Sequence, residues 1–330
     1  MNEELKLSRF AGYAWFVLAY NVVVIIWGAF LRASLSGDGC GQHWLTCGGE
    51  IVPSAPQFKT IIEFSHRVST GLAFFVVLIL FVWAFKKYKK NQSVRKAAFA
   101  SFVFIVAEAL IGAGLVLTGN TAENLTASRP FWMAAHLITT FSLLAVLTLT
   151  AWLASGGKSF EFGAERRIPL LLAIAVFGIF LVGMSGSVAA LSSMLFPSAT
   201  LAEGVAKDFS ETSNILLRLR VSHPILSVSV GVYLIFLANW IKSRARENLQ
   251  VNRWTTVLTV LIGVQFLAGA FTFLMLAPIV LQLVHLLLAD AVWVAFVLMA
   301  ASILADENFY TEKEYSVKAQ SALKEMRVKN

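Results

Sequence analysis

Charged residues are scarce in this 330-residue chain: only 14% are Asp, Glu, Lys or Arg, whereas 58% are hydrophobic. The mean hydropathy of +0.72 is higher than an ordinary soluble domain reaches. The alternating segments of about ten residues that are typical of a membrane barrel are also missing. These absences exclude a soluble globular protein and favour a bundle of membrane-spanning helices.

Apolar runs of about 20 residues, long enough to cross a bilayer as helices, occur eight times. We therefore expect an all-α polytopic membrane protein with eight transmembrane helices in the lipid bilayer. No linker indicates a separate soluble domain. The runs cover residues 11–33, 61–85, 97–118, 131–154, 169–191, 220–241, 255–276 and 279–303.

Positive charge is unevenly distributed along the chain. Most of the 27 Lys and Arg residues lie in the two tails and in the connections that follow the second, fourth and sixth runs. The positive-inside bias makes these segments cytoplasmic and places both termini inside the cell. The net charge of +8 is explained by this bias, so we expect no nucleic-acid partner.

An internal repeat divides the chain into two halves. Glu108 to Ala113 in the third run matches Gln265 to Ala270 in the seventh, and Ser65-His66 in the second matches Ser222-His223 in the sixth, both at an offset of 157 residues. Two matches at one offset predict two tandem, pseudo-symmetric four-helix bundles. The expected parts are a cytoplasmic N-tail (1–10), an N-terminal half (11–155), a cytoplasmic linker (156–168), a C-terminal half (169–304) and a cytoplasmic C-tail (305–330).

Four of the five histidines stand near the starts of the even-numbered helices: His66, His136, His223 and His285. Even-numbered helices begin on the outer side in this topology, so the four imidazoles lie at a similar depth near the outer face, one pair in each half. No carboxylate or thiol cluster beside them completes a tetrahedral zinc site. Two facing imidazoles in an apolar bundle suit a haem iron, and we expect one haem site in each half.

The two propionates of a haem require cations, and guanidinium groups match carboxylates well. The available arginines are Arg67 beside His66, Arg32 at the outer end of the first helix, and Arg218 and Arg220 beside His223. The alternative for each is that it anchors a helix end to lipid headgroups.

Glu63-Phe64-Ser65-His66-Arg67, the loop from Gly39 to Cys47, the duplicated plan and the four histidines resemble haem A synthase over residues 11–303 or so. The resemblance implies a plasma-membrane oxidoreductase that acts on a methyl group of haem O and converts it to the formyl group of haem A. It also implies that His66 and His136 lie about the iron of the substrate haem O, that His223 and His285 ligate a haem b redox cofactor, and that Glu63 is the catalytic carboxylate.

The second half departs from the first in ways that bear on this assignment. Arg220 occupies the position that corresponds to Glu63, so we expect chemistry only in the N-terminal half. Pro224 follows His223 where the family more often has Arg, so the propionates there depend on Arg218 or Arg220. The roles of Glu108 and Asp290 stay open, with a neutral hydrogen-bonded carboxyl and a proton path as the alternatives for Glu108.

Both cysteines of the protein, Cys40 and Cys47, lie in the loop that faces the oxidising side, where a disulfide is expected. A structural staple and a redox-active pair are the two interpretations.

Two other classes of protein remain as alternatives: a di-haem cytochrome b that transfers electrons across the membrane, and a haem-handling protein without chemistry. Four histidines near one face argue against the first, and Glu63 argues against the second. The expected partners are haem O, a haem O synthase that delivers it and an electron acceptor in the membrane; a homo-oligomer is left open.

Overall fold

The computed structural model describes residues 7–124, 126–160 and 167–306, and the described residues form helices joined by loops. Eight helical segments are long and apolar enough to cross a membrane, which confirms the predicted all-α polytopic fold. Parts of the predicted N-tail, linker and C-tail lie outside the described residues. The membrane-spanning helices are α1 (Arg9–Ala33), α2 (Phe58–Lys87), α3 (Ser93–Leu117), α4 (Arg129–Ala154), α5 (Arg167–Leu195), α8 (Ser222–Arg244), α9 (Leu249–Leu274) and α10 (Ile279–Leu304).

The long connection after α5 contains two short helices, α6 (Leu201–Phe209) and α7 (Ile215–Arg220). Helix α7 leads into α8 and extends that span beyond the predicted start at residue 220. The two helices are separate because Pro224 has no backbone N–H to donate to the carbonyl of Arg220, four residues earlier. The proline thus lies in the first turn of α8, where it is tolerated.

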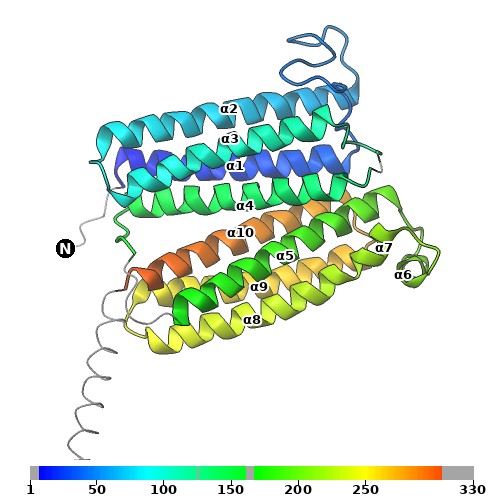
Figure 1. The fold of residues 1–330 in the computed structure, drawn as a ribbon. Coiled ribbons are helices and arrows are strands. Elements are labelled where there is room, and N and C mark those ends of the chain that lie inside the picture. The colour runs from blue at the N-terminus through cyan, green and yellow to red at the C-terminus, as the bar shows by residue number, and fades with distance from the viewer. Residues whose placement is uncertain (1–6, 125, 161–166, 307–330) are drawn as a thin grey trace, which may run out of the picture.

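Helices α1–α4 lie together as one group, and α5–α10 form a second group beside it (Figure 1). Helix α4 packs against both α5 and α10, and α1 also contacts α10. The indole of Trp293 in α10 donates a 2.7 Å hydrogen bond to the carbonyl of Phe141 in α4, and the two rings stack at 5.7 Å. The halves are therefore joined through a buried aromatic contact, while their pseudo-symmetry stays a prediction.

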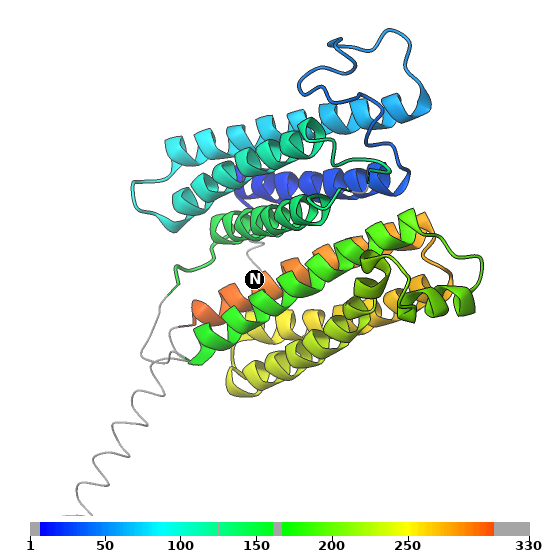
Figure 2. The same cartoon turned by 45° about the vertical axis from the view of Figure 1, so that its right-hand side comes forward.

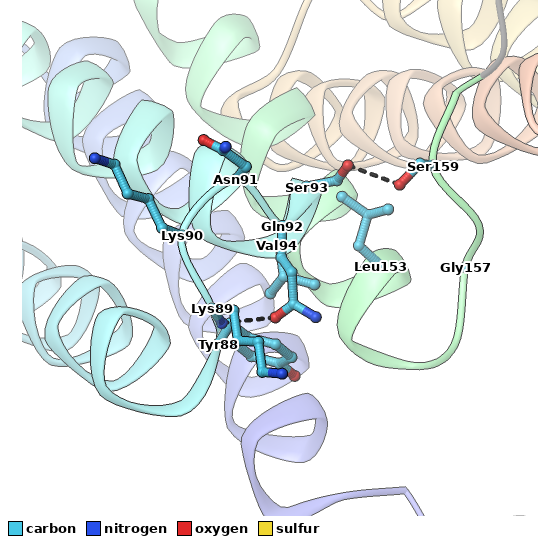
Figure 3. A pocket seen from close by; sticks show the side chains of 10 residues that line it. All are labelled: Tyr88, Lys89, Lys90, Asn91, Gln92, Ser93, Val94, Leu153, Gly157 and Ser159. Carbon is cyan, nitrogen blue, oxygen red and sulfur yellow. Dashed lines mark hydrogen bonds between the residues drawn. The ribbon is translucent and has the colours of Figure 1, made fainter.

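The loop between α1 and α2 lies at the same end of the bundle as α6 and α7 (Figure 2). The histidine-bearing starts of α2, α4, α8 and α10 belong to this end as well. At the opposite end, a hollow of about 610 Å³ lies around the α2–α3 connection, Gly157 and Ser159 (Figure 3). The hollow is remote from the histidines because it lies at the other end of the helices. The sequence predicts that this end is cytoplasmic.

Candidate functional site

His66 in α2 lies directly against α1. A Cβ atom built on Gly28 would stand 2.8 Å from Cε1 of His66, so the imidazole needs a glycine at that point of α1. The Nδ1 atom of His66 is buried and has no hydrogen-bond partner among the described residues. A buried polar atom without a partner is rare in native proteins and is typical of a site that receives a ligand.

His136 in α4 is held by a carboxylate from α3. Its Nδ1 lies 2.7 Å from Oε2 of Glu108. The hydroxyl of Thr139 donates to the same oxygen at 2.6 Å, and that of Thr140 donates to the other oxygen. The carboxylate fixes the orientation of the imidazole and engages Nδ1, which leaves Nε2 for a metal. His66 thus lies against α1 and His136 against α3, both within the group of helices α1–α4.

The C-terminal half repeats the contact between a glycine and a histidine. A Cβ atom built on Gly186 of α5 would lie 2.9 Å from Cε1 of His223 in α8. The corresponding distance from Gly28 of α1 to Cε1 of His66 is 2.8 Å. The Nδ1 atom of His223 lies 3.2 Å from the hydroxyl of Ser185. Each half thus places a glycine of its first span against the histidine of its second, which the sequence repeat had not indicated.

His223 and His285 come close enough to share a metal ion. Their ring centroids are 6.3 Å apart and the rings are nearly perpendicular, at 86°. Two imidazole nitrogens that each lie about 2 Å from one metal place their ring centroids about 6 Å apart. Gln265 in α9 lies beside this pair, with its Nε2 3.4 Å from Nε2 of His285. The spacing fits a haem iron between the two rings.

Glu63 is buried at the start of α2 and is 2% exposed. Its Oε2 accepts a 2.7 Å hydrogen bond from the backbone N–H of Cys40, and its Oε1 pairs with Arg67 at 2.5 Å. Arg67 also donates to the carbonyls of His43 and Thr46. The two side chains therefore hold the loop between α1 and α2 against the end of α2 that carries His66.

The predicted disulfide between Cys40 and Cys47 is confirmed, and both residues are buried. The loop approaches α2 closely at Gly39, where a Cβ atom would stand 2.4 Å from the backbone carbonyl of Lys59. The hydroxyl of Thr60 donates to the carbonyl of Gly39 at 2.8 Å. These contacts favour the interpretation of the disulfide as a structural staple.

Residues 11–297 match the family described as cytochrome oxidase assembly protein, COX15-CtaA. The chain belongs to this family. The resemblance stated from the sequence motifs is thereby confirmed.

Named proteins with similar sequences include two farnesyltransferases and several heme A synthases. Two proteins of Thermus thermophilus named protoheme IX farnesyltransferase are 44% identical over 297 residues, which cover 90% of this chain and 49% of theirs. The chain thus spans about half the length of these relatives. The heme A synthase of Alkalihalophilus pseudofirmus is 29% identical over 259 residues, 75% of this chain and 82% of that protein. The heme A synthase of Halalkalibacterium halodurans is 36% identical over 138 residues, 42% and 44% of the two chains.

The arginines predicted to bind the propionates have different surroundings from one another. Arg220 forms an ion pair with Asp208 of α6, in which its Nε and Nη2 donate to Oδ1 at 2.9 Å and 2.5 Å. Arg218 is exposed, and Arg32 is half-buried. Arg129, at the start of α4, is buried and was missed by the sequence reasoning. The one feature of the sequence that could have indicated Arg129 is its place immediately before Pro130, at the outer end of an apolar run.

Asp290 lies five residues beyond His285 in α10. It is 1% exposed, and neither carboxyl oxygen has a hydrogen-bond partner among the described residues. Nothing around it assigns it a role in the family's site.

Proposed function

We propose that this protein is a haem A synthase that binds haem O in its N-terminal half and a haem b cofactor in its C-terminal half. Membership of a cytochrome oxidase assembly family and the similarity to proteins named heme A synthase support the reaction. The observation that carries the assignment of sites is the presence of two helical histidines in each half, with Glu63 one turn before His66 and no counterpart of it in the other half. A pure haem carrier has no need of that carboxylate.

His66 and His136 would flank the iron of haem O, and His223 and His285 would ligate haem b. Bound haem b supplies a one-electron carrier between the substrate and an acceptor. Glu108 acts as a positioning residue, because its 2.7 Å hydrogen bond to His136 sets the ring orientation and makes the imidazole a stronger donor.

Glu63 is the proposed catalytic carboxylate. Oxidation of a methyl group withdraws electrons from its carbon, so positive charge develops there and a nearby carboxylate stabilises it. Arg67 and the N–H of Cys40 hold this carboxylate in place. The disulfide loop thus positions the reactive group from the outer end of the bundle.

The substrate is expected to come from an enzyme that adds a farnesyl group to protohaem. The Thermus relatives carry the name of that activity, and this chain matches half of their length. We propose that the two reactions act on the same haem in succession. Both take place in the plasma membrane, where this chain has its two termini in the cytoplasm and passes electrons to an acceptor in the bilayer.

The test is the conversion of haem O by the purified full chain in detergent, supplied with membrane extract as the source of the electron acceptor. Haems extracted before and after incubation are identified by mass. The expected result is a product that has gained one oxygen and lost two hydrogens. Recovery of haem O unchanged, from a protein that binds it, would contradict the proposed reaction.

A further inference from the structure

Two arginines, Arg32 and Arg129, stand at the outer end of the N-terminal half. Arg32 lies in the last turn of α1, and Arg129 is the first residue of α4, a helix that packs against α1. Because α1 ends and α4 begins at the outer end of the bundle, the packing of the two helices brings both arginines to that end. Neither forms an ion pair with any of the described residues.

Arg129 is 3% exposed, yet its hydrogen-bonding capacity is not filled. One terminal nitrogen donates to the carbonyl of Asn124 at 2.8 Å, whereas the buried Nε has no partner. The residue also lies at a helix N-terminus, where the macrodipole disfavours a cation. A buried guanidinium without a counter-charge is costly within a membrane protein, and an anion beside both arginines would offset that cost.

Two of the other arginines near the histidines are already engaged. Arg67 pairs with Glu63, and Arg220 pairs with Asp208. The feature is also specific to the N-terminal half: by the 149-residue offset between His136 and His285, Pro278 stands where Arg129 would be repeated. An anion held here therefore belongs to the ligand of the N-terminal half alone.

We propose that Arg32 and Arg129 form a clamp for a carboxylate of the substrate porphyrin, one of the two propionates of haem O. Guanidinium forks bind carboxylates in a bidentate manner, and two of them around one carboxylate give direction as well as affinity. The clamp lies on the same side of α4 as the proposed iron ligand, because Arg129 precedes His136 by about two turns of that helix. A porphyrin held only at its iron can turn in its own plane. The clamp stops that rotation and so selects the methyl group that faces Glu63.

This inference rests on the proposed function, and its test uses two probes that differ only in the carboxylates. Iron protoporphyrin IX and its dimethyl ester are each titrated into the full chain that already contains one haem in the C-terminal half. The dissociation constant of the second equivalent is measured from the absorption spectrum. The variants are Arg129→Gln, Arg129→Lys and Arg32→Gln, and the control is Arg253→Gln, an exposed arginine at the opposite end of the bundle.

In the wild-type protein the diester is expected to bind about tenfold to hundredfold more weakly than the free acid, the range that follows from losing a charge-assisted hydrogen bond. Arg129→Gln and Arg32→Gln weaken binding of the free acid by a similar factor and leave binding of the diester unchanged. Arg129→Lys retains part of the preference because it keeps the charge and loses the fork. The control retains the full preference.

Equal affinity of the wild-type protein for the two probes would overturn the clamp without recourse to any variant. Equal losses for both probes in Arg129→Gln would show that the arginine supports folding instead. A wild-type chain that takes up one haem only, on His223 and His285, would overturn the proposed function itself, which is a different failure from loss of the preference for carboxylates.

Discussion

The partners of His136 and His285 differ in charge, and exchanging them gives a sharp prediction. Glu108 lies 2.7 Å from Nδ1 of His136, whereas Gln265 lies 3.4 Å from Nε2 of His285. A carboxylate gives the imidazole more anionic character and so stabilises the oxidised iron that it ligates. Glu108→Gln should therefore raise the reduction potential of the haem in the N-terminal half.

The magnitude follows from the change of hydrogen bond. A hydrogen bond to a charged group contributes about 1.5–3 kcal/mol, and a neutral one about 1 kcal/mol. A difference of about 1.4 kcal/mol between the two partners changes the ratio of oxidised to reduced iron about tenfold. For a one-electron couple this is a rise of about 59 mV.

The assay is an optical redox titration of the full chain with both sites filled, in which His136→Ala and His285→Ala assign the two haem signals. Glu108→Gln should shift the N-terminal signal and leave the C-terminal one in place. Gln265→Glu should lower the C-terminal potential. An N-terminal potential that does not change in Glu108→Gln, in a protein that still binds haem there, would refute the reasoning; equal shifts at both sites would show a global change.

The remaining predictions concern the loop and the cofactor. Glu63→Gln should leave both haems bound and stop the formation of haem A, as measured by mass analysis of extracted haems; continued production would remove the catalytic assignment. His285→Ala should abolish the low-spin spectrum of haem b, and an unchanged spectrum would place that haem elsewhere. Cys40→Ser should lower the free energy of unfolding by about 2–3 kcal/mol through the opened loop and reduce turnover, because the loop then holds Glu63 less firmly; lost turnover at unchanged stability would favour a redox role. Gly39→Ala should destabilise the protein by about 1–3 kcal/mol, because its Cβ would meet the backbone of Lys59. The control Gly71→Ala has open space around it and should be neutral or slightly stabilising in the same melting experiment.

The linear sequence determined the spans of this protein and named the side chains that are proposed to carry its chemistry. A run of about 20 apolar residues crosses a bilayer whatever its neighbours are, so all eight spans could be predicted. The two cysteines were the only possible disulfide, and four histidines at one depth already indicated paired ligands. The sixth span begins earlier than predicted, at Ile215, because the short helix α7 precedes α8 and its charged residues Arg218 and Arg220 interrupt the apolar run.

Only the tertiary structure decided which charges meet. Glu108 reaches His136 from a different helix, Arg220 pairs with Asp208, and the packing of α1 against α4 brings Arg129 to the same end of the bundle as Arg32. The partner of a long side chain depends on how helices pack, and a separation of a few ångströms decides whether a guanidinium is neutralised or left for a ligand. Hydropathy places a charge at a depth in the membrane, whereas the packing of α1 against α4 gives that charge its neighbour.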